Sequence, residues 1–374
     1  MMVSLLQQLI RIPSENNGVT GYEYTVQHFY FNWLRDHGIS AELIDPETIP
    51  GFDQNPGRLK EHSIHMRPSV IAGLEGNRPG KTLLLLAHAD TVPVGPLSDW
   101  NDSPFSGKIE DGRIYGRGSG DDKWGMALMA ALMVELKKSH CDFPGKLIIA
   151  AVADEESGGA NGTAAVFAHG VKADEAIYLD GGSNLTIWHA GLGGGFCRIS
   201  GGDPAEVRRI IRETKDEIRR KIDASPYFGP DFFRIIEKQF YLISETQTRI
   251  GFFHDTLPGE DEAELKTAFE RKLPGCTFTW MSRFLKPAVV PKDSPLVQNL
   301  IRSFRKAAGK ELPAVGGVQS DQGIVMMLGK IPCILFGCGR RGVPGASHLP
   351  NEFIEIANLE TVYRTVLDYL RSNG

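Results

Sequence analysis

Hydrophobic residues are spaced along this chain in two ways, as short continuous runs and at intervals of three to four residues. The clearest run is Leu83–Ala87, and His88, Ala89 and Asp90 follow it directly. Four consecutive leucines are typical of a strand that is buried on both faces, so we expect the polar pair at the carboxyl end of that strand. His88 and Asp90 are two residues apart on an extended chain, so their side chains leave it on the same face.

The other apolar runs predict further strands, and helical spacing predicts the segments between them. The predicted strands lie around residue 43 and at 70–74, 146–153, 176–179, 248–253, 277–283 and 332–336, with a hairpin at 109–115. The predicted helices cover 1–12, 22–37, 124–136, 163–169, 204–222, 260–273, 295–308 and 322–328, and the last begins at 359. Strands that alternate with helices in this way predict an α/β fold.

The pattern changes near residue 190 and changes back near residue 286. Gly191–Gly195 is a glycine-rich stretch that we interpret as a hinge, and short strands alternate with charged helices after it. The chain therefore predicts a larger domain formed by residues 1–189 and 286–374, with a smaller α+β domain inserted at 190–285. A length of 374 residues also suits two domains better than one.

Composition and charge narrow the range of partners. The net charge of -5, with both signs interspersed, argues against a nucleic-acid partner. No apolar run approaches the roughly 20 residues of a membrane span, so we expect no membrane partner. The five cysteines are scattered and form no CxxC pair, which favours reduced thiols and a cytoplasmic location.

Side chains that bind metals gather where the predicted strands end. They are His88, Asp90, Glu155, Glu156 and Asp180 at strand ends, Asp121 at the start of a helix, and His348 after the last strand. A set rich in carboxylates, with two imidazoles and no thiol, suits a pair of divalent ions, of which zinc fits best. Two-metal sites share one oxygen ligand, and the glycine-rich approach to Asp121 suits it for that position. Glu155 and Glu156 are adjacent, so one can bind a metal while the other takes up a proton.

Each of these residues also has an ordinary structural interpretation. Asp121 is well placed to cap the following helix, and Asp180 precedes two glycines as turn residues often do. Residues 154–156 read equally well as a solvated turn, and His348 as a loop histidine. All of these interpretations would have to hold together, however, and so many metal-binding side chains at strand ends favour a metal site.

The motifs around these residues resemble the M20 family of metallopeptidases and amidohydrolases, which includes glutamate carboxypeptidases, aminoacylases and carnosinase-like dipeptidases. The matching segments are His88–Pro93, Gly116–Lys123, Asp154–Gly159, Ser320–Asp321 and His348–Glu352. The resemblance covers roughly residues 1–190 and 286–374. It implies a zinc-exopeptidase-like catalytic domain with a central mixed sheet flanked by helices, and an inserted smaller α+β lid domain.

The resemblance also implies a role for each residue. His88 and Asp180 would bind one zinc, Glu156 and His348 the other, and Asp121 would bridge the two. Asp90 would orient the ring of His88, and Glu155 would be the general base that activates the bridging water. The peptide bond between Asp121 and Asp122 is expected to be cis. Zinc is the expected metal, and Co²⁺ or Mn²⁺ stay open.

The chain departs from the family pattern in its substrate-facing residues. Asp180 stands where Glu is more typical of carboxypeptidases and deacylases, whereas Asp is more typical of aminopeptidases and dipeptidases. The lid lacks the family's Gly-x-x-x-His-Ser segment, and Asp255 falls where an Arg often grips a substrate carboxylate, if Pro258–Gly259 is the right anchor. We take Asp255, His254 and Gly339 as candidate substrate-binding residues. His189 is the other histidine near the lid.

Three functions compete on these residues. The first is a dinuclear-zinc hydrolase that cleaves small peptides with a free amino end, because Asp255 would attract an ammonium group. The second is an N-acyl amino acid deacylase or related amidohydrolase, or a carboxypeptidase of the same family. The third is a non-catalytic metal-binding or scaffold protein, which the intact Glu155 disfavours. Either a monomer or a homodimer formed through the lid is compatible with the sequence.

Overall fold

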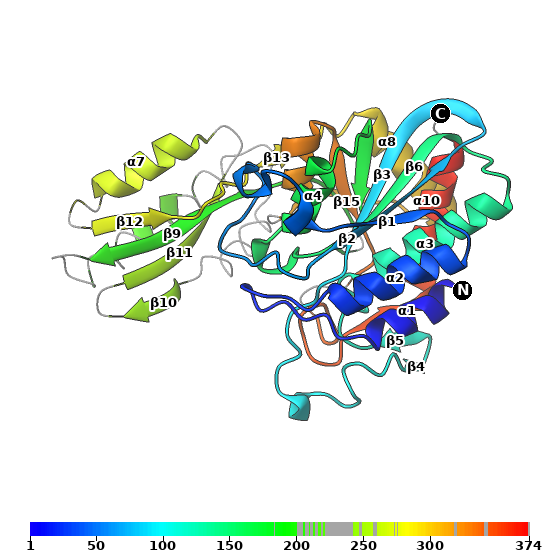
Figure 1. Ribbon diagram of the computed structural model, residues 1–374, viewed down its shortest axis with the longest axis horizontal. Coiled ribbons are helices and arrows are strands. Elements are labelled where there is room, and N and C mark those ends of the chain that lie inside the picture. Colours follow the sequence, from blue (N-terminus) through cyan, green and yellow to red (C-terminus); the bar gives the residue numbers. More distant parts are fainter. Residues whose placement is uncertain are drawn as a thin grey trace.

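The structure is a computed structural model of the chain. It describes residues 1–182, 184–199, 242–246, 249–256, 260–272, 274, 276–317, 320–339 and 343–372, and also residues 205, 209, 212, 213, 216, 217 and 220. Figure 1 shows two lobes, a larger one built around a nine-stranded sheet and a smaller one built around a four-stranded sheet. Both ends of the chain lie in the larger lobe (Figure 1). The residue boundaries of the two domains stay a prediction.

The nine-stranded sheet of the larger lobe is mixed, as the resemblance implies. Its strand order is β1-β2-β6-β3-β7-β15-β8-β13, and β14 pairs with β8. The strands are β1 (Ala41–Ile44), β2 (Ser69–Glu75), β3 (Arg78–His88), β6 (Pro144–Val152), β7 (Glu175–Tyr178), β8 (Leu185–His189), β13 (Ala288–Val289), β14 (Ala314–Gly317) and β15 (Cys333–Phe336). β3 runs parallel to both β6 and β7, so the carboxyl ends of these three strands meet at one edge.

Strand β3 is buried on both faces because its leucines alternate between two hydrophobic clusters. Leu83 and Leu85 belong to one cluster, and Leu84 and Leu86 belong to the other. Complete burial of one leucine side chain is worth about 1.5–3 kcal/mol relative to exposure. A shift of the strand by one residue would therefore exchange every partner, which fixes its register. The prediction of a strand with two buried faces is confirmed.

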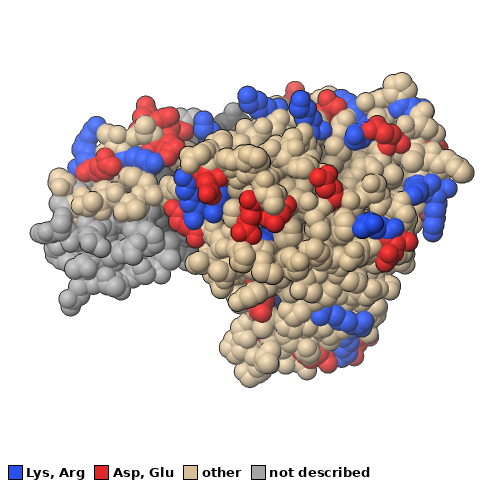
Figure 2. All heavy atoms as spheres, viewed as in Figure 1, with Lys and Arg blue, Asp and Glu red and all other residues tan. Residues whose placement is uncertain are grey.

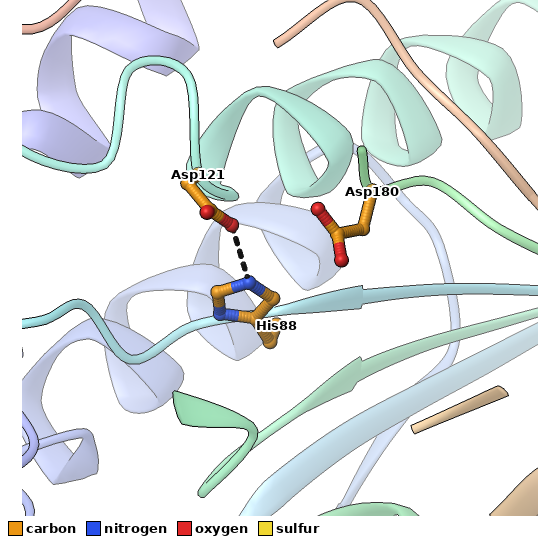
Figure 3. A group of neighbouring side chains, drawn as sticks. All are labelled: His88, Asp121 and Asp180. Atoms are coloured by element: carbon orange, nitrogen blue, oxygen red, sulfur yellow. Dashed lines mark hydrogen bonds and ion pairs between the residues drawn. The ribbon is translucent and has the colours of Figure 1, made fainter. Parts of the chain in front are cut away.

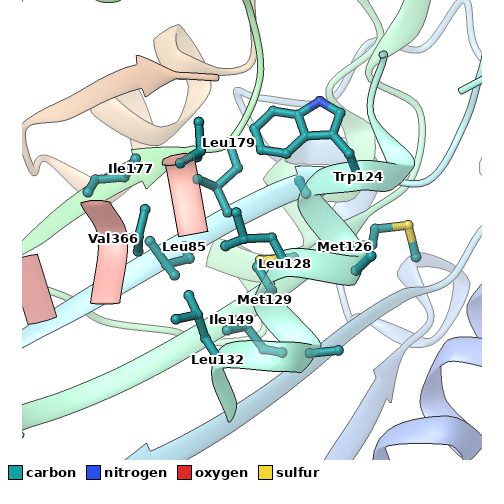
Figure 4. Packing of buried hydrophobic residues seen from close by; sticks show 14 of the residues in the cluster. Leu85, Trp124, Met126, Leu128, Met129, Leu132, Ile149, Ile177, Leu179 and Val366 are labelled. Carbon is teal, nitrogen blue, oxygen red and sulfur yellow. The ribbon is translucent and has the colours of Figure 1, made fainter. Parts of the chain in front are cut away.

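Helices cover the sheet, and one of them is almost wholly buried. The helices of the larger lobe are α1 (Met2–Ile10), α2 (Tyr24–Asp36), α3 (Lys123–Lys138), α4 (Asn161–Ala168), α8 (Pro295–Ala308), α9 (Gln322–Ile324) and α10 (Ile356–Ser372). Nearly every side chain of α3 is buried. Figure 4 shows Leu128 and Leu132 of α3 in the same cluster as Leu85 and Val366. This packing fixes the start of α3, where the predicted bridging carboxylate lies.

The smaller lobe is an antiparallel sheet with one helix packed against it. The strand order is β10-β11-β9-β12, and the elements are β9 (Gly191–Ile199), β10 (Leu242–Thr246), β11 (Arg249–Thr256), β12 (Cys276–Trp280) and α7 (Glu262–Lys272). Phe269 of α7 meets Trp280 of β12 edge to face, with the ring centroids 6.0 Å apart. The helix predicted over 204–222 and the anchor Pro258–Gly259 lie largely outside the described residues.

The interpretation of Gly191–Gly195 as a hinge stays a prediction, but the structure gives these residues a regular conformation that the sequence did not predict. These residues form the first part of β9, which pairs with β11 from Gly191 to Arg198 and with β12 from Gly195 to Ile199. Glycine has no side chain to mark a strand by its hydrophobic pattern, yet its backbone N–H and C=O groups pair as in any other residue.

The remaining differences concern short elements. The hairpin at 109–115 is confirmed as β4 (Ile109–Glu110) and β5 (Arg113–Tyr115), and β16 (Phe353–Glu355) adds a third strand beside β5. The pattern does not predict β8, β10, β13, β14 or β16, because two to five residues leave little periodicity to detect. The helix predicted at 322–328 is a short α-helix that continues as a π-helix over Val325–Gly329. Short 3-10 turns lie at Pro46–Thr48, Phe52–Gln54, Leu97–Asp99 and Glu156–Gly158.

The distribution of surface charge and the state of the cysteines agree with what the composition predicts. Figure 2 shows acidic and basic side chains interspersed over the face in view. In the described part of the chain, Cys141, Cys276, Cys333 and Cys338 are free, and the last two are buried. None of the helices in that part has both the length and the apolar character that crossing a bilayer requires.

Candidate metal centre and active site

His88, the last residue of β3, faces the carboxylate of Asp121. Its Nδ1 lies 3.0 Å from the backbone carbonyl oxygen of Asp90, and its Nε2 lies 2.9 Å from Asp121 Oδ1. A carbonyl oxygen accepts hydrogen bonds and donates none, so Nδ1 must carry a hydrogen. In the neutral ring Nε2 then presents a lone pair to a carboxylate oxygen, which is unfavourable. Either a second proton on the ring or a cation between the two atoms relieves that contact.

Asp121 links two groups of ligand atoms through its two carboxylate oxygens. Oδ1 faces His88, and Oδ2 lies 3.1 Å from Nε2 of His348. The same Nε2 lies 3.2 Å from Oε2 of Glu156. One group is His88, Asp121 and Asp180, and the other is Asp121, Glu156 and His348; within each, the ligand atoms all lie within 4.8 Å of one another. Figure 3 shows Asp180 directed toward the space beside His88 and Asp121.

The two groups have the spacing and the charge that suit metal ions. Zinc binds histidine nitrogen and carboxylate oxygen at about 2.0–2.2 Å, which puts two ligands of one tetrahedral ion about 3.3 Å apart. The observed separations of 2.9–3.2 Å between ligand atoms are close to that value. Burial raises the pKa of Glu156, while His348 and His88 together hold the pKa of Asp121 well below its usual value against the effect of burial. Carboxyl groups outnumber imidazoles here, so cations would relieve the repulsion between them.

Glu155 lies beside these ligands and belongs to neither group. Its side chain is 15% exposed, and its Oε2 is 3.9 Å from Nε2 of His88. Burial raises the pKa of Glu155 well above its usual value, and the charges of Asp321, Asp180 and Glu156 add to that effect. A carboxyl group with a raised pKa takes up a proton more readily than an ordinary glutamate, which is the property that a general base requires.

Asp90 contributes in a way that the sequence did not reveal. Its carboxylate Oδ1 is 3.6 Å from His88 Nδ1, so the ring hydrogen-bonds to the backbone carbonyl of Asp90 and not to the side chain. The carboxylate instead accepts the backbone N–H groups of Glu155, at 3.1 Å, and of Glu156, at 2.9 Å. Asn16 donates to it as well, at 2.9 Å. Asp90 therefore holds both β3 and the loop that carries the two glutamates.

The loop after β6 has a left-handed backbone at several positions. Asp154, Ser157 and Ala160 have φ values of 62°, 62° and 59°, which side-chain-bearing residues rarely adopt. The carboxylate of Asp154 is buried and binds Arg67 at 2.9 Å and His62 at 2.8 Å. Sequence reasoning missed these partners, and no local signal marks them, because each comes from a distant part of the chain.

Two loops that carry predicted ligands are tied together by Glu352. Its carboxylate accepts from the buried guanidinium of Arg117 at 2.5 Å and from the backbone N–H of Gly120 at 2.7 Å. Gly120 directly precedes Asp121, and Glu352 follows His348 by four residues. The peptide bond between Asp121 and Asp122 is cis, so that prediction is confirmed.

The candidate substrate-binding residues lie in different places. Gly339 donates to the carbonyl of Gly181 at 2.9 Å, beside Asp180, so it lies close to the metal-type ligands. His254 and Asp255 lie in β11, opposite Gly193 and Leu192 of β9, and their side chains fall outside the described features. His189 is fully buried, and its Nδ1 lies 2.5 Å from the carbonyl of Ala190. Burial lowers the pKa of His189 to about 4, so it is neutral near pH 7.

The sequence matches the model of peptidase family M20/M25/M40 over residues 84–372. That range covers most of the chain and includes every residue of the two ligand groups. The chain belongs to this family. Membership confirms the prediction of an M20-type hydrolase that acts on amide bonds, and the central mixed sheet with flanking helices is the fold of the family.

Known proteins of the family resemble this M20 chain over nearly its whole length. A succinyl-diaminopimelate desuccinylase from Xanthomonas campestris pv. campestris (strain B100) is 26% identical over 376 residues, which cover 90% of this chain and 94% of the relative. The structure of an M20 family metallo-carboxypeptidase from Sulfolobus solfataricus superposes with a TM-score of 0.74 at 19% identity, covering 99% of this chain and 98% of the other. Human carnosine dipeptidase 1 gives a TM-score of 0.69 at 14% identity, covering 99% and 95%. At such identities these two structures establish the fold.

Proposed function

We propose that this M20 protein is a dinuclear metal hydrolase that cleaves the amide bond of small peptides with a free amino end. The observation that carries the proposal is the position of Asp121, whose two carboxylate oxygens face different histidines at 2.9 and 3.1 Å. A carboxylate shared in this way is the arrangement that two neighbouring metal ions require. His88 and Asp180 would hold one ion, and Glu156 and His348 the other.

The ligand set favours zinc, because it combines imidazole with carboxylate and includes no thiol. Two bound divalent ions would lower the pKa of a water between them and polarise the carbonyl group of the substrate. Cobalt and manganese accept the same ligands. Metal dependence is common to the family.

Glu155 is the residue that we assign to proton transfer. Its carboxylate would take a proton from the attacking water and deliver it to the nitrogen of the leaving amine. Its position beside both ligand groups and its raised pKa support this role. Asp90 would act through the backbone, since its carboxylate fixes the N–H groups of Glu155 and Glu156.

The preference for a free amino end rests on Asp180, which occupies the ligand position in place of Glu, and on Asp255, which falls where an arginine would bind a carboxylate. A carboxylate at position 255 would favour an ammonium group on the substrate and repel a carboxylate. Hydrolysis of N-acyl amino acids is the second candidate, because the relative from Xanthomonas campestris is a desuccinylase. The catalytic residues serve either reaction.

A paired assay separates the two candidates. The zinc-loaded protein is offered a series of dipeptides with a free amino group and the same series N-acetylated. We expect kcat/KM to be higher for the free-amine series. Higher values for the acetylated series would support the deacylase and remove the role of Asp255. If neither series were cleaved by a protein that binds two equivalents of zinc, the proposal would fail for both substrate classes.

A further inference from the structure

Arg283 is a buried arginine at the point where the chain returns from the smaller lobe to the larger one. It lies three residues after the end of β12, and it is 5% exposed. Its guanidinium donates to three backbone carbonyls: Nη1 to Gly57 at 3.0 Å and to Gly159 at 2.5 Å, and Nη2 to Gly158 at 2.5 Å. No carboxylate in the described part of the chain lies within ion-pair distance of it. Burying a charged guanidinium without a counter-ion is unfavourable, and the hydrogen bonds to these three carbonyls offset part of that cost.

Two of the three carbonyls belong to the turn that follows Glu155 and Glu156. Gly158 and Gly159 come two and three residues after Glu156. The same turn contains Ser157 and Ala160, whose φ values of 62° and 59° are left-handed. A turn of this kind persists only where surrounding contacts hold it. Arg283 supplies the contacts from the side of the smaller lobe, whereas Asp90 supplies them from the side of the sheet.

Ser282, the neighbour of Arg283, makes contacts of a different kind. Its hydroxyl donates to the carboxylate of Glu61 at 2.6 Å and accepts the backbone N–H of Lys60 at 2.8 Å. These contacts fasten the same return segment to the larger lobe, yet they do not touch the turn at Gly158 and Gly159. Ser282 therefore offers a matched control. Ser282→Ala removes the two hydroxyl contacts and so weakens the attachment of the return segment, keeps the backbone N–H that donates to Glu61 at 2.9 Å, and does not touch the turn.

We propose that Arg283 is a positioning residue, which sets the turn at Gly158–Gly159 and thereby the placement of the Glu155 carboxylate. Because Arg283 belongs to the return segment of the smaller lobe, the position of that lobe is coupled to the position of the base. The proposal rests on the proposed function in so far as Glu155 is the base. It assigns to Arg283 no contact with substrate or metal.

The first experiment compares Arg283→Met, Arg283→Lys and Ser282→Ala in the full-length, zinc-loaded protein. Arg283→Met should lower kcat by about ten-fold to a hundred-fold, because small displacements of a catalytic group have effects of that size. KM should change by less than about two-fold, and two equivalents of zinc should stay bound. Arg283→Lys should recover part of kcat, since one ammonium reaches fewer carbonyls than a guanidinium. Ser282→Ala should keep the wild-type kcat.

Three results of this experiment would overturn the assignment. A wild-type kcat in Arg283→Met would mean that the turn holds without the guanidinium. An equal loss in Ser282→Ala would mean that weakening the attachment of the return segment is enough to lower kcat, and that the contact to the turn has no separate effect. A rise in KM with kcat unchanged would point to substrate binding in place of positioning.

A second experiment needs no activity, so it distinguishes failure of this proposal from failure of the proposed function. Hydrogen exchange followed by mass spectrometry reports the backbone N–H of Gly159, which bonds to Glu155 at 3.2 Å, and that of Ala160, which bonds to Asp154. Arg283→Met should speed exchange in residues 154–160 by about ten-fold or more, while β3 keeps its protection. Unchanged exchange in this segment would refute the proposal, whether or not any substrate is found. If Arg283→Met does not fold, Arg283→Lys decides by the same measurement.

Discussion

Glu352 and Arg117 form a buried ion pair, with 2.5 Å between Oε2 and Nη1, that joins the loop ending at Asp121 to the loop that begins at His348. Both side chains are at most 2% exposed, and the second carboxylate oxygen of Glu352 accepts the N–H of Gly120. Each of the two loops carries one ligand of the second group. The relative position of Asp121 and His348 therefore depends on this pair.

We expect Glu352→Gln to weaken metal binding and to destabilise the fold. Removing one partner of a buried ion pair typically costs about 3–5 kcal/mol, and loss of a contact behind a metal ligand typically lowers metal affinity about 10–100-fold. Zinc affinity is measured by competition with a chelating dye, and stability by urea unfolding of the metal-free protein. Lys108→Met, which breaks the exposed pairs with Asp102 and Glu110, is the control and should leave zinc affinity and the urea midpoint close to the wild-type values, because exposed ion pairs contribute little. Equal effects of the two variants would mean that the buried pair does not position the loops.

Glu155→Gln should separate proton transfer from metal binding. The amide cannot accept the proton, so kcat should fall by about a hundred-fold to ten-thousand-fold, the usual contribution of a general base. Zinc content should stay at two equivalents because Glu155 belongs to neither ligand group. Glu156→Gln is the matched variant, one residue away, and should lose zinc as well as activity. Turnover close to the wild-type value in Glu155→Gln would show that another group takes the proton.

Gly339→Ala should destabilise the protein through a steric clash. A Cβ atom at Gly339 would lie 2.7 Å from the carbonyl oxygen of Gly120 and 2.9 Å from that of Gly181. Both contacts are with backbone next to predicted ligands, so the loops must separate, at a cost of about 1–3 kcal/mol. A Cβ atom at Gly182, the bridge partner of Gly339, would lie 3.7 Å from its nearest neighbour, the carbonyl oxygen of Gly339. Gly182→Ala should therefore unfold near the wild-type urea midpoint, and a midpoint for Gly339→Ala that matched it would contradict the clash.

Most of the candidate ligand residues could be predicted from the sequence because they lie next to an element that local pattern identifies. The run that ends at His88 and the helix that starts beside Asp121 are recognised from neighbouring residues alone, and parallel strands bring such ends to one edge. Glu155 and Glu156 follow the same rule at the end of β6. The fold class was predictable for the same reason, since alternation of strands and helices is a local property.

Contacts between distant segments could not be predicted in this way. Arg283 lies 125 residues from Gly158, and Asn16 lies 74 residues from Asp90. Neither has a neighbour whose pattern indicates the contact. The strand conformation of residues 191–195 was not predicted for a related reason, because their place in β9 depends on backbone pairing with β11 and β12 and not on side chains.

Because of His189, the free energy of unfolding should decrease as the pH is lowered from about 6.5 to about 4. Its pKa is lowered from 6.5 to about 4 by burial, so the folded protein keeps it neutral while the unfolded chain binds a proton there. The unfolded state then binds more protons, and the stabilisation, complete above about pH 6.5, is lost as the pH falls to 4. Between pH 7.5 and pH 5 a shift of this size is worth about 2 kcal/mol.

The measurement is urea unfolding of the metal-free protein at pH 7.5 and pH 5, for the wild type and for His189→Asn. Asparagine keeps a donor near Nδ1 for the carbonyl of Ala190 but has no proton to gain in this range. The wild type should lose about 2 kcal/mol more than the variant on going to pH 5, whatever the other titrating groups contribute to both. Equal losses for the wild type and His189→Asn would contradict the prediction, because His189 would then take up a proton in the folded protein as readily as in the unfolded chain. A protonated ring would need a hydrogen-bond acceptor for its Nε2, and that atom has no partner in the described structure.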